Sequence, residues 1–415
     1  MKNADSPSLF SVDNSLPSCG GAGMGWAEWR GYLRCAWLAG ALVLLLYAPA
    51  LAQRKPPHKP WVNKIVQENS QMLDQLLREN LPEWAFLWDK PERYRLQILW
   101  TQVRRDRYNR PWVKHHSWRL DSTEYFFPAS MVKLATAAVA LEKLNVQREV
   151  GELSPHCPLT FEASPCTPAL TRLPEAPDSL ATVAFLIRQA LLVSDNPAYD
   201  RLYEFVGPEE LHARLWSKGY HSARIVSRYG NNCSADANRI ANAYSLNCGD
   251  TAILTESQRV WNNPPSLPTT NNQVGGSTYY RANFLSLEDL HLLTMAIMLP
   301  TSMPDSSRFF LSPKDFRILH NAMGQWPSES QSPLFEPGEW ERGRMKYLYY
   351  GGKNLVEHTT RSFNKVGMAR GFLTDSAYLV DFQDSVETFV SATLYVEPED
   401  APSDLPRGYD ALGLP

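Results

Sequence analysis

The chain has 415 residues, of which 44% are hydrophobic and 20% are charged, and its formal net charge at pH 7 is -3. This composition suits one large or two small globular domains with a sizeable core, and it excludes a disordered chain. The basic cluster 104–110 (RRDRYNR) contains an aspartate and is typical of a solvated turn. We therefore expect no nucleic-acid partner.

The N-terminal region has the pattern of a secretory signal peptide. Positive residues precede an uncharged apolar run, 35–48, and small residues follow it at 50–52. We expect cleavage after Ala52 and a periplasmic or secreted mature protein. A start at Met24 would give a signal of ordinary length, so the segment before it is expected to lie outside the natural product. The alternative is an uncleaved anchor over 35–52, which reaches the lower limit of a membrane span.

Cysteine usage agrees with export. Four cysteines follow the signal segment, and an even number in an exported chain indicates disulfides, each contributing about 2–4 kcal/mol. Of the three connectivities we expect local pairing, within the first pair and within the second; free buried thiols are the alternative. No Cys-x-x-Cys spacing favours a metal. The four are Cys157, Cys166, Cys233 and Cys248.

The first part of the chain predicts an extension followed by a hairpin. Residues 53–60 are polar and proline-rich, and the periodicity then predicts an amphipathic helix over 61–80, so we interpret 53–90 as an N-terminal packing extension. Two strands are predicted over 94–103 and 112–120, with the basic turn between them.

The stretch 125–144 (YFFPASMVKLATAAVALEKL) comes next and is almost wholly apolar. The pattern favours a helix from about Ser130, and a helix that is apolar all round is buried. Lys133 is the only charged residue between 126 and 141. The sequence therefore places one lysine inside a core.

Helices dominate the middle of the chain and strands its end. We predict loops over 151–178, 225–281 and 326–343, and a cap at Ser286 with Asp289 in the first turn of the helix that follows. Strands at both ends imply an α+β fold: an antiparallel sheet from about 91–122 and 355–400, an inserted all-helical lobe from about 125 to 350, and a cleft between them. A tail, 401–415, follows. The predicted helices are 181–193, 198–206, 208–218 and 287–298, and the predicted C-terminal strands are 362–368, 376–382 and 387–395.

Ser130 and Lys133 form a candidate nucleophile and base. Three residues apart on a helix, they share one face, and the serine lies where free backbone N–H groups favour developing negative charge. A buried lysine without a charged partner loses basicity, which lets its amine take a proton from a hydroxyl. The alternative is a chance Ser-x-x-Lys.

Two further motifs favour a catalytic Ser-x-x-Lys over a chance match. Ser194-Asp195-Asn196 follows a buried helix, and Lys365-Val366-Gly367 lies on a C-terminal strand. With Ser130-Met131-Val132-Lys133 they occur in the order found in penicillin-recognising serine hydrolases. Over about 91–400 the chain resembles the class A β-lactamase-like family of these enzymes.

The resemblance implies a role for each matching side chain in acyl transfer. Ser130 would be the acylated nucleophile and Lys133 its proton partner. Ser194 would carry the proton to the leaving nitrogen, and Asn196 would hold Lys133 and the substrate amide. The alternative for Ser194-Asp195-Asn196 is a helix end with turn-forming side chains.

The third motif would bind the substrate. Lys365 would attract its carboxylate and polarise Ser194, and the backbone N–H groups of Ser130 and Met368 would form the oxyanion hole. The family usually has Thr or Ser after this lysine, whereas Val366, which precedes Gly367, has no hydroxyl to donate. We therefore expect weaker binding of ordinary β-lactams. The alternative for Lys365 is an exposed lysine on an edge strand.

Deacylation is the second departure from the family. Class A enzymes use a glutamate in a loop some thirty to forty residues after Ser-Asp-Asn, and this chain has no glutamate between 225 and 255. Asp236 is the candidate carboxylate for activating water, the alternative being a solvated loop or helix cap. Without such a base the acyl-enzyme would hydrolyse slowly.

Three functions therefore compete. The first is an exported serine hydrolase of class A type that hydrolyses β-lactams; the second is a peptidoglycan DD-peptidase or esterase with the same acyl chemistry; the third is a non-catalytic binding module that kept the fold. We expect a small acyl substrate, either a β-lactam or a peptidoglycan-derived peptide, a monomer, no cofactor and no metal. The adjacent His115 and His116 should face opposite sides of their strand.

Overall fold

The computed structural model describes residues 65, 69–147, 151–230, 233–250, 252–264, 266, 272–279, 282–335, 345–350, 359–398 and 408–409. The expected signal peptide, the start at Met24 and almost all of the expected tail lie outside these residues. Among the described helices, none combines the length and the apolar character that a membrane span requires.

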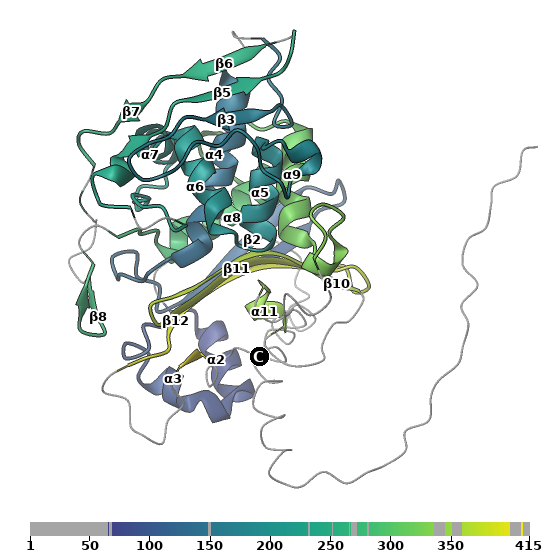
Figure 1. Cartoon of the computed structure of the whole chain (residues 1–415). Coiled ribbons are helices and arrows are strands. Elements are labelled where there is room, and N and C mark those ends of the chain that lie inside the picture. The colour runs from purple at the N-terminus through teal and green to yellow at the C-terminus, as the bar shows by residue number, and fades with distance from the viewer. Residues whose placement is uncertain are drawn as a thin grey trace, which may run out of the picture.

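A five-stranded antiparallel sheet joins the two ends of the described chain (Figure 1). Its order is β10-β11-β12-β1-β2, so the first strand of the chain lies beside the last, with Trp100 opposite Val390. This confirms the predicted sheet from both termini. The strands are β1 (Gln97–Arg105), β2 (Pro111–Trp118), β10 (Thr360–Ala369), β11 (Phe372–Asp381) and β12 (Val386–Tyr395).

The sheet is covered on both faces, and each face has its own core. Successive side chains on a strand point to opposite faces. On β1, Leu99 packs into the core shared with the helical lobe, whereas its neighbour Trp100 packs into the core on the other face. Three short helices cover that other face: α2 (Gln71–Asn80), α3 (Ala85–Asp89) and α11 (Tyr347–Tyr350).

Helix α2 is shorter than the periodicity predicts. Ser70 has an extended backbone, and its hydroxyl accepts a hydrogen bond from Leu73 N at 3.4 Å, so the helix begins at Gln71. Ile65 and Asn69 precede it without helical structure. The predicted helix over 61–80 is therefore correct only for its second half among the described residues.

Six helices form most of the lobe on the face of the sheet opposite α2, α3 and α11 (Figure 1). The central one, α4, has buried side chains from its first turn to its last, as its all-apolar sequence predicts. The predicted cap is also confirmed, since Ser286 Oγ accepts from Asp289 N at 3.2 Å. The helices are α4 (Val132–Val146), α5 (Val183–Leu192), α6 (Asn196–Val206), α7 (Pro208–Ser217), α8 (Leu287–Met298) and α9 (Pro313–Gly324).

The lobe is not all-helical, which corrects the prediction. The segments expected as loops over 151–178 and 225–281 contribute short antiparallel strands at its outer edge. Their alternating patterns run for two to four residues, too short to stand out from loop sequence. The strands are β3 (Leu159–Phe161), β4 (Ile240–Ala241), β5 (Tyr244–Asn247), β6 (Ile253–Glu256), β7 (Arg259–Val260), β8 (Gln273–Val274) and β9 (Ser277–Thr278).

The cysteines form two disulfides, as predicted, but the expected local pairing is wrong. Cys157 is bonded to Cys248 and Cys166 to Cys233, with Cα atoms 5.0 and 5.5 Å apart. Strand β3 pairs with β5, so the segment that follows Cys157 lies against the segment that precedes Cys248. Both bridges therefore join the two loop-rich segments to each other.

Candidate active site

Ser130 lies in a 3₁₀ turn, Ala129–Met131, that leads directly into α4. Its neighbour Ala129 has a left-handed backbone with φ 46°. Strand β10 approaches this turn closely at Gly367, where an added Cβ would lie 2.5 Å from the Pro128 carbonyl oxygen. Only glycine permits that approach, so Gly367 lets the edge strand pack against the turn that contains Ser130.

Lys133 lies one turn further along the same helical face and is fully buried. Its Nζ donates to Asn196 Oδ1 at 2.6 Å and to the Ser194 carbonyl oxygen. Burial lowers the pKa of Lys133 to about 7, against the opposing effect of Asp195 and Asp200. A neutral amine has two N–H groups and one lone pair. These two acceptors take the N–H groups, so the lone pair is left to accept a proton from a hydroxyl, and Ser194 Oγ lies 3.3 Å away.

Ser194 lies between two buried lysine amines. Its Oγ is 2.9 Å from Lys365 Nζ and 3.3 Å from Lys133 Nζ. Lys365 also donates to the Val366 carbonyl oxygen at 2.8 Å, and burial together with the nearby Lys133 holds its pKa well below the ordinary value. The predicted interpretation of Lys365 as an exposed edge lysine is therefore wrong. One hydroxyl bridges the two amines, which is the geometry of a proton relay.

Helix α6 places the second motif. Ser194 has a left-handed backbone with φ 59°, which turns the chain between α5 and α6. Asp195 Oδ1 then accepts from Ala198 N at 2.6 Å and caps α6, so that Asn196 begins the helix facing Lys133. The motif is thus both a helix start and a set of polar partners for the buried lysine.

A cavity of about 580 Å³ opens in front of these groups. The lobe contributes Ser130 and Asn196 to its wall and β10 contributes Met368, which confirms the predicted cleft between sheet and lobe. Val366 is 5% exposed and is absent from the lining. The lining residues are Phe127, Ala129, Ser130, Asn196, Ser227, Arg228, Tyr229, Cys233, Ala235, Asn238, Thr278, Tyr279, Ala282, Met368, Ala369 and Arg370.

No hydrogen bond joins Lys133 Nζ to Ser130 Oγ among the residues that the structure describes. Such contacts often shorten only when substrate binds. β10 is the edge strand of the sheet, so alternate backbone N–H groups point away from β11. Met368 lines the cavity beside Ser130, as an oxyanion hole made of their N–H groups would require.

Asp236 is not brought to the reacting groups. Its side chain is 86% exposed and lies 3.4 Å from Arg239. Its neighbours Ala235 and Asn238 line the cavity, but Asp236 is not among the lining residues. Its part in deacylation stays a prediction without support from its position.

Asp200 is a site residue that the sequence interpretation missed. It lies one turn after Asn196 on α6, and its carboxylate accepts from Tyr229 N at 2.7 Å and Gly230 N at 3.0 Å. Burial raises the pKa of Asp200 to about 6. The carboxylate thereby holds the backbone of the cavity wall, and the four-residue spacing from Asn196 was the available signal.

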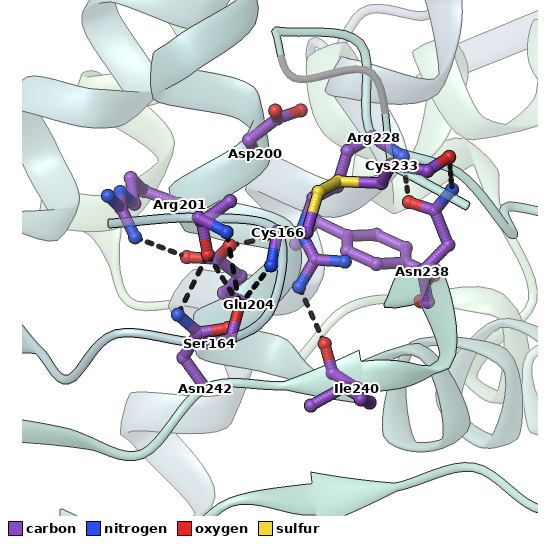
Figure 2. A network of polar contacts seen from close by, with 12 residues as sticks. Ser164, Cys166, Asp200, Arg201, Glu204, Arg228, Cys233, Asn238, Ile240 and Asn242 are labelled. Atoms are coloured by element: carbon purple, nitrogen blue, oxygen red, sulfur yellow. Dashed lines mark hydrogen bonds and ion pairs between the residues drawn. A yellow bond between two sulfur atoms is a disulfide. The ribbon is translucent and has the colours of Figure 1, made fainter. Parts of the chain in front are cut away.

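A buried ion pair and a disulfide support the same wall. Arg228 Nε donates to Glu204 at 3.0 Å, and its Nη2 donates to the Ile240 carbonyl oxygen at 2.6 Å. Figure 2 shows the bridge between Cys166 and Cys233 beside this pair. Because Cys233 itself lines the cavity, the disulfide fixes that part of the wall to the lobe.

Metal chemistry has no candidate ligands in the described part of the chain. No group of three or more His, Cys, Asp or Glu side chains is placed to hold an ion there. The histidine pair faces opposite sides of β2 as predicted: His115 contacts Thr101 at 2.7 Å, whereas His116 contacts Ser70 at 2.8 Å.

Comparison with known proteins agrees with the motifs. A family model described as the Beta-lactamase enzyme family matches residues 113–253, a segment that contains Ser130, Lys133 and 194–196. The resemblance to the β-lactamase-like, penicillin-recognising family is thereby confirmed. The search of curated proteins gave no match.

Several solved structures are similar in fold. The β-lactamase from Desulfarculus baarsii is 13% identical, with a TM-score of 0.44 over 80% of this chain and 91% of that chain. The β-lactamase from Streptosporangium roseum is 16% identical, with a TM-score of 0.43 over 78% and 91%. The β-lactamase from Streptomyces albus G is 14% identical, with a TM-score of 0.42 over 79% and 92%.

Proposed function

We propose that the chain is an exported serine hydrolase of β-lactamase type that forms an acyl-enzyme on Ser130. The observation that carries the proposal is the buried amine of Lys133. It lies one turn from a half-buried serine at a cavity wall, it is hydrogen-bonded only to uncharged acceptors, and its pKa is about 7. The two disulfides suit an extracellular or periplasmic location.

The proposed acylation uses the described residues in sequence. The neutral amine of Lys133 takes the proton of Ser130 Oγ, and that oxygen attacks the substrate carbonyl. The N–H groups of Ser130 and Met368 bind the oxyanion. Ser194 Oγ then gives its proton to the leaving nitrogen and regains one from Lys133, while Lys365 polarises the same hydroxyl.

A second candidate is a DD-peptidase or esterase in which the acyl-enzyme persists. None of the described residues that line the cavity is an Asp or a Glu, so no carboxylate there can activate the water that attacks the ester. β-lactam hydrolysis would then be slow after rapid acylation. The third candidate, a binding module without catalysis, has in its favour only the missing hydroxyl at Val366.

Intact-mass spectrometry of the full chain mixed with benzylpenicillin or a cephalosporin tests these candidates over seconds to hours. A drug-sized adduct that forms and clears while drug is consumed supports a β-lactamase. An adduct that lasts supports the DD-peptidase or esterase.

Ser130→Ala should lower adduct formation by at least about 10³-fold, since the nucleophile is gone. Ser227→Ala is the matched control, because it removes another serine from the same cavity wall and should acylate normally. Acylation of Ser130→Ala at the normal rate would refute the nucleophile. If neither β-lactams nor an ester probe label the unaltered chain, the binding module is the better description.

A further inference from the structure

The cavity wall has an unusual balance of charge. Its described lining contains two arginines, Arg228 and Arg370, and no acidic side chain. The two lysines behind Ser130 are buried and already bonded to protein oxygens. Any anionic group on a substrate would therefore meet the arginines first.

Arg228 is not free to bind a ligand. Its side chain is fully buried, and its guanidinium is bonded to Glu204 and to the carbonyl oxygens of Ala237 and Ile240. Its charge is neutralised inside the wall. Arg228 is thus part of the structure and not of the recognition surface.

Arg370 is in the opposite situation. It is exposed at the cavity, with its Cζ atom 5.2 Å above the Phe127 ring and 5.7 Å above the Tyr279 ring. Among the described residues it has neither an ion pair nor a hydrogen-bond partner. Two aromatic faces hold the guanidinium in place, and its planar fork of N–H donors faces no protein anion.

Strand β10 sets the position of Arg370 relative to the reacting bond. Along this strand Lys365 contacts Ser194, which serves the leaving nitrogen, and Met368 lies beside Ser130 at the carbonyl. Strand β10 ends at Ala369, and Arg370 follows directly in the turn to β11 with a left-handed backbone, φ 53°. It is thus at the end of β10 that lies beyond Met368 as counted from Lys365. It therefore lies on the acyl side of the scissile bond, opposite the leaving group.

We propose that Arg370, held over Phe127 and Tyr279, binds a carboxylate on the acyl portion of the substrate. This inference rests on the proposed function, because it assigns the specificity of the same site. The proposal also agrees with the absence of a hydroxyl donor at Val366. In this chain a substrate anion would be bound at the acyl end of β10, by Arg370, and less at the leaving-group end, near Val366. The substrate class is an acyl donor with an acidic side chain near its carbonyl.

Benzylpenicillin and carbenicillin provide the test, since they differ by one carboxylate on the acyl side chain. Equilibrium binding is measured first in Ser130→Ala, where no covalent step can occur. We expect carbenicillin to bind about tenfold more tightly than benzylpenicillin, and Arg370→Gln to remove that preference. Arg370→Lys should keep part of it, because it retains the charge but not the bidentate fork.

Arg107→Gln is the matched control. Arg107 is another exposed arginine over an aromatic ring, 4.7 Å from the centroid of Tyr108, but it lies in the β1–β2 turn away from the cavity. Arg107→Gln should leave the preference for carbenicillin over benzylpenicillin unchanged. Equal affinities for the two drugs, or a preference that survives Arg370→Gln, would overturn the inference.

Acylation rates in the chain with Ser130 intact then separate the two proposals. A binding preference without any acylation keeps the role of Arg370 and refutes the proposed hydrolase. Acylation of Ser130 at equal rates by both drugs, with no difference in Arg370→Gln, keeps the hydrolase and refutes the role of Arg370.

Discussion

Two lysines on helix α4 are equally buried and chemically opposite. Lys133 and Lys143 both have no exposed side-chain surface. Lys133 is bonded to an amide oxygen and to backbone and hydroxyl oxygens, whereas Lys143 contacts Glu210 and Glu256, each at 2.9 Å. Burial lowers the pKa of both amines, but at Lys143 the two adjacent carboxylates oppose this effect directly.

The direction of the helix adds to the difference. Lys133 lies in the first turn of α4, where the helix dipole disfavours a positive charge, and Lys143 lies in the last turn, where it favours one. The same residue type in the same core is thus the proposed base at one end of the helix and the partner of two carboxylates at the other. What separates them is the chemistry of their partners and not the depth of their burial.

A third lysine shows that burial among uncharged partners is not sufficient to make a lysine a candidate base. Lys346 is buried on the other side of β10, donates to Met323 O, Ser362 O and Asn364 Oδ1, and has a pKa lowered to about 7 by burial. It is not among the residues that line the cavity. A lowered pKa alone therefore does not identify a base. The lysine must also lie beside a candidate nucleophile and a cavity that can admit substrate.

The largest expected effect is on the chemistry at Lys133. Lys133→Met keeps the length of the side chain and removes the base, so acylation of Ser130 should slow by about 10³-fold, equivalent to about 4 kcal/mol in the barrier. The free energy of unfolding should not fall, because a costly buried amine is removed. Stopped-flow acylation and urea unfolding give the two values, and normal acylation would contradict the assignment of the base.

The reverse is expected at the other end of the helix. Lys143→Met removes the buried amine between Glu210 and Glu256, which keep Arg214 and Arg259 as ion-pair partners. The free energy of unfolding should drop by about 2 kcal/mol, less than for a fully unpaired buried charge. Acylation per folded molecule should stay within about twofold. If Lys143→Met instead lost most of its acylation rate and none of its free energy of unfolding, the proposed difference between Lys133 and Lys143 would be wrong.

The smallest effect is a pH dependence. Acylation needs the neutral amine of Lys133, whose pKa is about 7, so the rate should rise with pH and level off above that value. Between pH 8 and pH 6 the neutral fraction, and with it the rate, should fall about tenfold. Second-order acylation rates from pH 5.5 to 8.5 measure this. Lys143→Met should keep the same inflection, and a flat profile would argue against Lys133.

Local signals in the sequence were sufficient for much of the fold. The cap at Ser286 fixed helix α8 to the residue, and the apolar run after Phe126 placed α4 in the core. The three motifs named side chains that the structure brings into hydrogen-bond contact around Ser194. Each of these predictions depends on neighbours along the chain or on a motif with a fixed order.

What could not be predicted depends on contacts between distant segments. The disulfide pairing follows from β3 lying beside β5, more than eighty residues later in the chain. Helix α9 is an exception, because the capping box of Ser312 and Asp315 is a local signal that indicates its start. Arg370 acquires its position only when Tyr279 and Phe127 meet over the cavity, and no spacing in the sequence indicates that meeting.

The order of strands in the sheet also sets when the proposed active site can be completed during synthesis. Ser130, Lys133 and Ser194 leave the ribosome early, whereas β10 with Lys365 and Met368 comes late, and β12 must still insert between β11 and β1 before the sheet is continuous. At about 5–20 residues per second, Ser130 is synthesised tens of seconds before Lys365 and Met368. A chain that stops before Val386 would contain Ser130 and Lys133 but would lack β12, the strand that connects β10 and β11 to β1, and should therefore form no acyl-enzyme.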